Sequence, residues 1–292
     1  MSNTAALQHK KTPGRLIFVM INLAFLTVLA LTMIIPFLNV LAVSFTTNLE
    51  SYENTIKLFP KKISIAGYID LFRRVEIAQP LINNTIVTVT GTLFHILLCS
   101  MAGFVLIRAN FPGKAAVVIL ITIPMMIPFQ MIIIPVFVTM RRLGLIDTLA
   151  SLVLIDIVST FSILLMKNYF EGIPRSLEES AIIDGANEWT VFSKIYLPLA
   201  KPGIATIGIF QFVSRWNHFL PAVLFINSTE KFTLQIALKS LVVNSELTSS
   251  TQSVANNARM AGIVVSIIPL IIVYIFAQKY FTSGIMVGAV KE

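Results

Sequence analysis

Two ionisable side chains, Asp156 and Arg215, lie deep inside apolar stretches of the sequence. A charge in the hydrocarbon of a membrane is costly unless it is paired or faces water, so such residues are candidates for function. We predict that Asp156 and Arg215 form an ion pair in the interior of a helix bundle. The pair would be structural, or it would belong to a translocation path.

The residues around Arg215 are unusually polar for an apolar stretch, with the sequence QFVSRWNHF over 211–219. Sugars are recognised by planar hydrogen-bonding groups and by aromatic faces, which predicts a saccharide path here. Hydrogen bonds between helices, with an aromatic ring near the interface, are the alternative explanation. The candidate path residues are Gln211, Arg215, Trp216, Asn217 and Asp156.

The composition predicts the elements that hold these residues. Hydrophobic residues make up 56% of the 292 residues and charged residues 12%, which excludes an ordinary soluble domain. Charges are confined to short segments between long apolar runs, so we predict an all-α polytopic membrane protein with one transmembrane domain over 1–292. Its six transmembrane helices are expected at about 16–43, 83–107, 115–140, 149–169, 203–226 and 260–278.

Further features refine this prediction. Pro124, Pro128 and Pro135 predict that the third apolar segment is bent or broken. A short surface helix is expected at 66–73. Six crossings place both termini on the same side, but positive residues are almost equally distributed between the two sides and do not fix the orientation.

Several other chemistries are excluded. No segment fits a phosphate-binding loop, because Gly113-Lys114 lacks the upstream glycine and the following hydroxyl residue. The three histidines are not spaced as metal ligands, and no nucleophile and base stand together, so we expect neither a metal, a bound cofactor nor an enzyme. The single cysteine, Cys99, allows no internal disulfide, and no basic and aromatic cluster indicates nucleic acid.

A polar interruption at 171–202 separates the fourth and fifth apolar segments. Ser176 to Glu179 fits a capping box that would begin a helix, and Gly185 suits its end. A second helix at 187–196 would stop at Leu197-Pro198. The two helices are expected to expose apolar residues that need a cover, either the protein's own helices or another protein; these residues are Ile182, Ile183, Trp189, Val191, Phe192 and Ile195.

The sequence ESAIIDGA followed by NEWTVFSKIYLP resembles the EAA loop of ATP-binding-cassette (ABC) importer permeases, with Ser180 in place of the usual first alanine. The resemblance implies the type I ABC importer permease fold and a cytoplasmic loop that docks on an ATPase subunit. It also implies a bacterial cytoplasmic (inner) membrane protein with both termini in the cytoplasm. The loop positions that match the family motif are Glu179, Ser180, Ala181, Asp184, Gly185, Ile195, Leu197 and Pro198.

Three further stretches resemble the carbohydrate branch of these importers, specifically the second permease of the maltose inner-subunit type: LFPKKISIAGYIDLF, FQFVSRWNHFLPAVLF and SGIMVGAVKE. The resemblance implies a homologous second permease subunit, two ATPase subunits that bind ATP and Mg, and an extracytoplasmic solute-binding protein. It implies an oligosaccharide or polysaccharide cargo, neutral or of the uronate type such as alginate. The loop 244–259 is expected to reach the solute-binding protein.

An ion-coupled secondary transporter that uses Asp156 as its ion site is the alternative function. Such carriers are often built from inverted internal repeats, and none is evident in this sequence.

Overall fold

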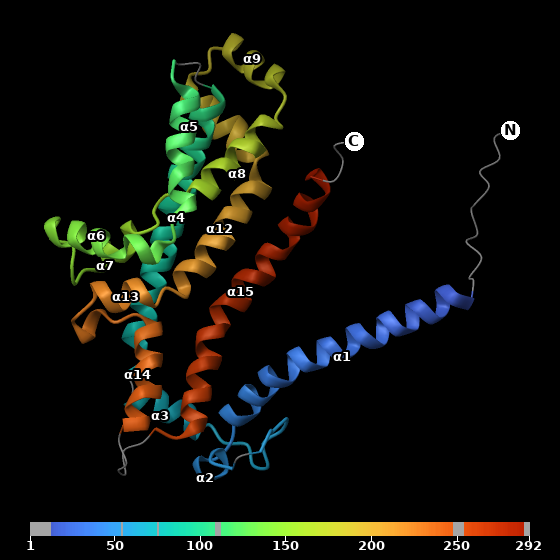
Figure 1. Cartoon of the computed structure of the whole chain (residues 1–292), viewed down its shortest axis with the longest axis vertical. Coiled ribbons are helices and arrows are strands. Elements are labelled where there is room, and N and C mark those ends of the chain that lie inside the picture. The colour runs from blue at the N-terminus through green and yellow to red at the C-terminus, as the bar shows by residue number, and fades with distance from the viewer. Residues whose placement is uncertain (1–12, 54, 75, 109–111, 248–253, 289–292) are drawn as a thin grey trace. The chain divides into compact units, whose positions relative to one another are not determined.

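The computed structural model describes residues 13–53, 55–74, 76–108, 112–247 and 254–288, and these residues form helices and connecting segments without a strand (Figure 1). The chain divides into two compact units. The first comprises residues 1–71 with 254–264, and the second comprises residues 72–253 with 265–292. Of the loop 244–259 predicted to reach a solute-binding protein, residues 248–253 lie outside the described residues; 244–247 belong to α14 (Leu234–Leu247) and 256–259 to α15 (Asn256–Gly288).

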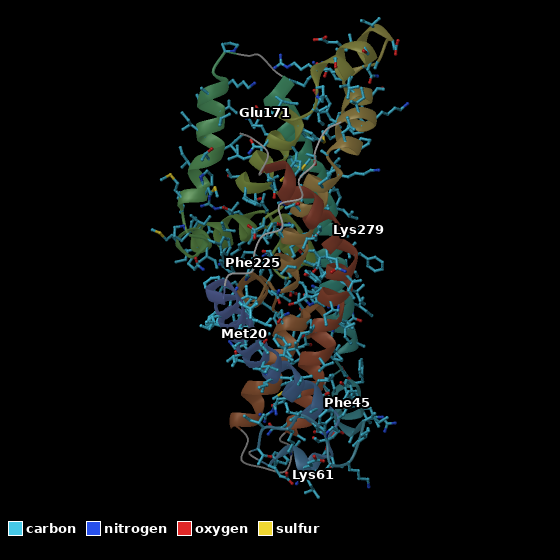
Figure 2. All side chains as sticks on the ribbon, turned by 90° about the vertical axis from the view of Figure 1, so that its right-hand side faces the viewer. Met20, Phe45, Lys61, Glu171, Phe225 and Lys279 are labelled. Atoms are coloured by element: carbon cyan, nitrogen blue, oxygen red, sulfur yellow. The ribbon has the colours of Figure 1, made fainter. Side chains whose placement is uncertain are left out.

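The first unit contains α1 (Pro13–Ser44), α2 (Asn48–Ser51), most of α3 (Ala66–Arg74) and the start of α15 (Asn256–Gly288). All side chains of α1 from Leu16 to Leu38 are exposed, as expected of an apolar helix that meets lipid or another protein. Figure 2 draws the side chains as sticks, with Met20 of α1 labelled. The short helix predicted at 66–73 is confirmed as α3. Asn257 fixes α15 in this unit by donating to the carbonyl of Thr46 at 2.9 Å.

The second unit is built around α4 (Ala78–Arg108), along which α8 (Thr160–Glu171) and α12 (Lys201–Trp216) pack (Figure 1). Gly103 allows the close approach of α4 and α8, because a Cβ there would lie 2.9 Å from the backbone nitrogen of Lys167. The core at this end of the unit is aromatic: the Phe104 and Tyr196 rings meet at 5.1 Å, and Phe170 and Tyr196 at 5.6 Å.

The third apolar segment is bent, as its prolines predict. It forms α5 (Lys114–Thr122), a 3-10 turn (Ile123–Met126) and α6 (Phe129–Arg142), and the two arms make an angle of 104°. Without a free N–H, a proline cannot continue the hydrogen bonds of a helix, which explains the break.

The segments predicted as transmembrane helices at 149–169 and 203–226 are each interrupted. The first segment divides into α7 (Leu149–Leu154) and α8, and the second divides into α12 and α13 (Leu220–Phe225). Asp156 lies in the first break with a φ of 56°, a left-handed conformation that no helix interior contains. Pro221 lies in the first turn of α13, the helical position that proline tolerates best.

The remaining described elements are α9 (Arg175–Ile183), α10 (Glu188–Thr190), a π-helical turn (Val191–Tyr196), α11 (Leu197–Leu199), a 3-10 turn (Thr229–Lys231) and α14 (Leu234–Leu247). Within the described part of the chain, three helices are long and apolar enough to cross a membrane: Leu16–Ser44, Ala78–Arg108 and Asn256–Lys279. The number becomes five if each of two bent helix pairs counts as one span. The expected number of six is therefore not reached by length and composition alone.

We predict that Gly103→Ala destabilises the second unit, because the added methyl would meet the backbone of α8. Overpacking of this kind lowers the free energy of unfolding by about 1–3 kcal/mol. The higher helix propensity of alanine raises it by less than about 1 kcal/mol. Thermal unfolding in detergent should show a lower melting temperature. Gly172→Ala is the matched control, since its Cβ would meet nothing closer than 3.5 Å. Equal melting temperatures for the two variants would contradict the prediction.

Candidate functional site

The polar interruption forms two short helical elements joined by a sharp turn, but the first begins differently from the prediction. Helix α9 starts at Arg175 after Pro174, whose φ of −60° already suits a helix, and no side chain caps it. Ser176 is thus inside the first turn, where its carbonyl accepts a hydrogen bond from the Ser180 hydroxyl at 2.8 Å. The predicted capping box is wrong, because a capping serine must precede the helix.

The predicted end of α9 at Gly185 is confirmed. Gly185 has a φ of 85°, the left-handed conformation that glycine adopts at low cost. Its N–H donates to the carbonyl of Ile182 at 3.0 Å, and the N–H of Ala186 donates to the carbonyl of Ala181 at 2.9 Å. These two bonds form a Schellman motif, so the chain leaves α9 in a defined direction.

The second element begins as predicted and ends later. The Asn187 side chain caps it by accepting from the N–H of Thr190 at 2.8 Å. The helical path then widens into the π-helical turn and continues through Pro198 to Leu199, so the stop predicted at Leu197-Pro198 is wrong. In a π turn each N–H bonds to the carbonyl five residues earlier instead of four. The carbonyl that the proline ring would otherwise strike is therefore displaced. The chain bends by 80° only at Ala200, before α12.

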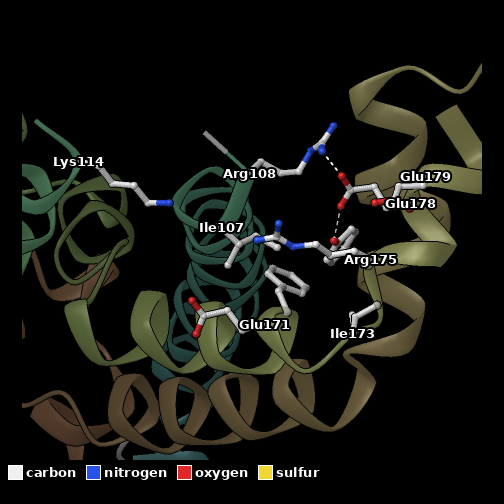
Figure 3. Close-up of a pocket in the computed structure, with 10 residues that line it drawn as sticks. Ile107, Arg108, Lys114, Glu171, Ile173, Arg175, Glu178 and Glu179 are labelled. Atoms are coloured by element: carbon white, nitrogen blue, oxygen red, sulfur yellow. Dashed lines mark hydrogen bonds and ion pairs between the residues drawn. The ribbon is translucent and has the colours of Figure 1, made fainter. Parts of the chain in front are cut away.

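A buried carboxylate connects this loop to the end of α4. Glu178 of α9 accepts from the hydroxyl of Tyr196 at 2.5 Å and forms an ion pair with Arg108, the last residue of α4 (Figure 3). The Nε of Arg108 also donates to Glu188 of α10 at 3.0 Å. One guanidinium therefore joins three elements. Sequence reasoning missed these residues, since 70 positions separate Arg108 from Glu178 and no local motif marks the pair.

The apolar residues of the loop divide into two sets. Val191 and Phe192 are fully buried against the aromatic core of the second unit, so the protein's own helices are the cover that these two residues need. Ile182, Ile183 and Trp189 are exposed, and Ile183 exposes 85% of its surface. We call the exposed surface of Glu179, Ile182, Ile183, Asp184 and Trp189 the loop tip. Its apolar residues have no cover among the described residues.

The positions matched to the family motif follow this division. Glu179, Ser180, Asp184, Gly185 and Pro198 are exposed, and Ala181, Ile195 and Leu197 are half-buried. Beside α9, a cavity of about 350 Å³ is lined by residues that include Arg108, Lys114, Glu171, Arg175 and Glu179 (Figure 3). Both the tip and this cavity present charged side chains.

Arg215 makes a different contact from the one predicted. Its side chain is fully buried, and its two terminal nitrogens donate to the carbonyls of Leu152 and Ile155, each at 2.9 Å. No ion pair joins it to Asp156, whose carboxylate lies 3.4 Å from the Nε2 atom of His218. The break between α7 and α8 explains the difference: it frees backbone carbonyls in apolar surroundings, and the guanidinium has enough donors to satisfy them.

Two more side chains hold the same break. Gln211 of α12 donates to the carbonyl of Asp156 at 3.1 Å, and the Nδ1 atom of His95 in α4 lies 3.0 Å from that oxygen. Since a carbonyl can only accept, Nδ1 carries the proton and Nε2 accepts from the Ser162 hydroxyl at 2.8 Å. We call Arg215, Gln211 and His95 the carbonyl brace.

The candidate path residues therefore differ in their surroundings. Gln211, Arg215 and Trp216 are buried and donate to backbone carbonyls of other elements; the Trp216 indole donates to Ser266 at 2.9 Å. This is the alternative explanation, hydrogen bonding between helices. Asp156 and Asn217 are exposed, and a role in a path stays a prediction for them.

The geometry can be compared with known proteins. Residues 95–287 match the family described as binding-protein-dependent transport system inner membrane component. A polygalacturonan/rhamnogalacturonan transport system permease protein of Bacillus subtilis is 36% identical, over 94% of this chain and 98% of that protein. An arabinooligosaccharides transport system permease protein of Halalkalibacterium halodurans is 31% identical, over 98% of this chain and 100% of that protein.

A solved structure is similar over nearly the whole chain. It is the crystal structure of a bacterial ABC transporter involved in the import of the acidic polysaccharide alginate. One of its chains superposes with a TM-score of 0.85 and 31% sequence identity, covering 92% of this chain and 98% of that chain.

We predict that Glu178→Gln loosens the loop whereas Glu179→Gln does not. Glu178 is buried and accepts from both Arg108 and Tyr196, and a hydrogen bond to a charged group contributes about 1.5–3 kcal/mol. Hydrogen exchange at 175–199 should become faster only in Glu178→Gln. Equal exchange in both variants would show that the buried carboxylate does not fix the loop.

The carbonyl brace gives a second prediction. A Cβ at Gly91 would lie 2.4 Å from the Arg215 Nη1 atom, so Gly91→Ala must displace the guanidinium from its carbonyls. We expect a loss of about 3 kcal/mol, since the carbonyls of Leu152 and Ile155 would lose charged donors. Gly208→Ala on α12 is the control, because its Cβ would meet only the flexible end of Ile96 at 3.1 Å. Melting temperatures in detergent measure both, and an unchanged Gly91→Ala would contradict the brace.

Proposed function

Because the chain belongs to the binding-protein-dependent transport system inner membrane component family and has the type I ABC importer permease fold, we propose that it is one of two permease subunits of a carbohydrate importer. A homologous second permease completes the pathway through the membrane. Two separate ATPase subunits bind ATP and Mg, and an extracytoplasmic solute-binding protein delivers the cargo. This chain itself binds no cofactor and carries out no hydrolysis.

The loop tip is the observation that carries the proposal. It presents Ile182, Ile183 and Trp189 beside the carboxylates of Glu179 and Asp184. A small apolar surface with flanking charges suits docking into a groove of a folded partner. The ATPase subunit is that partner, and a basic side chain in its groove pairs with Glu179.

The attachment of the tip explains how ATP hydrolysis moves the permease. Helix α9 follows α8, and the second element continues into α12, so the loop joins two of the helices that pack on α4. The Schellman motif and the Arg108–Glu178 ion pair hold the loop in one shape. A movement of the ATPase therefore reaches α8 and α12 as the motion of a rigid lever.

The proposal also implies which side of the membrane each end of the bundle faces. The loop lies in the cytoplasm of a bacterial cell, and both chain termini lie on the same side of the inner membrane. Helices α5 and α6 contain no buried residue in the isolated subunit, although they are rich in apolar side chains. That surface is available to the second permease and to lipid.

The cargo follows from the relatives. They are named for polygalacturonan and rhamnogalacturonan, for arabinooligosaccharides and for alginate. We therefore propose an oligosaccharide or polysaccharide, neutral or of the uronate type. The ion-coupled alternative loses its basis, because it rested on Asp156 alone and the family consists of binding-protein-dependent systems.

The test uses Gly185→Val in the complete importer. A β-branched residue at a φ of 85° strains the turn by about 1–2 kcal/mol or more, which changes the direction of the loop tip. Each 1.4 kcal/mol is about a tenfold change in binding, so we expect at least about tenfold weaker ATPase association. ATPase co-purification and transport-coupled hydrolysis measure the effect.

Gly172→Val is the control, since this glycine also lies near the loop but has an ordinary φ of −75° and open surroundings. Full ATPase association in Gly185→Val, or equal loss in both variants, would refute docking through the loop tip.

A further inference from the structure

Helix α12 exposes one face only. After Lys201, its exposed residues are Phe210, Val213 and Ser214, and Asn217 follows directly at its C-terminal cap. Residues three and four apart lie on the same side of a helix, so these positions form a continuous stripe. Ile207, Gln211 and Arg215, on the adjoining side of the helix, are buried.

A carboxylate meets this stripe at the break between α7 and α8. Asp156 is exposed, and its Oδ2 atom lies 3.4 Å from the Nε2 atom of His218. The Ser214 hydroxyl lies 3.4 Å from the same nitrogen. The carbonyl brace holds the backbone of Asp156 directly, through Gln211 and His95. It thereby keeps the carboxylate beside the stripe.

Aromatic rings continue the same surface. Phe161 of α8 and Phe210 of α12 expose 45% and 54% of their surfaces, and their rings meet edge to face at 5.8 Å. The surface thus combines aromatic faces, a hydroxyl, an amide, an imidazole and one carboxylate. We call it the polar strip; its members are Asp156, Phe161, Phe210, Ser214, Asn217 and His218.

Lipid does not suit this strip, because a carboxylate in hydrocarbon is too costly. Side chains such as Asn217 can hydrogen-bond to a neighbouring helix, but the exposed carboxylate of Asp156 needs a positive partner or water, and a water-filled path supplies water. Hydroxyl, amide and carboxylate groups hydrogen-bond to sugar hydroxyls, and aromatic rings pack on the apolar faces of sugar rings.

We propose that the polar strip is a carbohydrate contact on the translocation path, with Asp156 and Asn217 as its hydrogen-bonding residues and Phe161 and Phe210 as its apolar wall. The proposal rests on the proposed function and adds the residues that touch the cargo. Arg215 is then a positioning residue. It holds the break in the backbone and does not contact the sugar.

The test is thiol labelling of the complete importer in membrane vesicles. Cys99 is the only cysteine and is fully buried, so Cys99→Ala gives a background for Phe210→Cys and Asn217→Cys. A charged, membrane-impermeant methanethiosulfonate reacts only with a thiolate in water. Val28→Cys, on the apolar helix α1, is the control. The thiols of Phe210→Cys and Asn217→Cys should react at least about tenfold faster than the thiol of Val28→Cys, because a thiolate forms in water and not in lipid.

Saccharides provide the second readout. Labelling is repeated with the loaded solute-binding protein and with oligosaccharides of galacturonan, arabinan or alginate. Slower labelling by several-fold with any one of them supports the proposal. Labelling no faster than Val28→Cys, no protection by any of the three, or loss of the second permease on purification would overturn it. Labelling without ATP is independent of the loop tip, so a failure here is distinguishable from a failure of ATPase docking.

Discussion

Backbone carbonyls freed at the break between α7 and α8 impose the main constraint on the second unit. In apolar surroundings an unsatisfied carbonyl costs several kcal/mol, so each must find a donor. Arg215, Gln211 and His95 supply these donors from α12 and α4. Because the donors lie on α4 and α12 and the acceptors lie on α7 and in the break before α8, these elements cannot slide past one another without breaking the bonds. Gly91 leaves the space that the guanidinium needs.

The same three helices meet again at the loop, where Arg108 at the end of α4 holds Glu178 and Glu188. Helix α4 is thus bound at its end by an ion pair and further along by the carbonyl brace. Between these points the contact is a close-packed apolar core. A force on the loop tip would move such a block as one body. This is the property that a permease needs if hydrolysis in one subunit is to change access in another.

Much of the fold and of the loop could be predicted from the sequence, because the signals are local. Long apolar runs predicted the helices, prolines predicted the bend at 123–128, and Gly185 predicted the end of α9. The local argument failed where two signals competed. Helix α9 starts directly after Pro174, so Ser176 lies inside the helix and does not cap it. The second element includes a π-helical turn and therefore continues beyond Pro198. The break after Trp216 had a local signal in Pro221, which starts α13, but the break at Asp156 had no comparable signal in the sequence.

The sequence by itself determined the class of protein, the position of the loop and the polar character of 211–219. Only the tertiary structure decided which of these polar residues is buried as a hydrogen-bond donor and which is exposed. Arg215 and Asn217 are two positions apart, yet one is buried against carbonyls some 60 residues away and the other is exposed. Glu178 and Glu179 differ in the same way. The reason is physical: burial and hydrogen-bond partners depend on which distant helices pack together, and adjacent residues of a helix point in different directions.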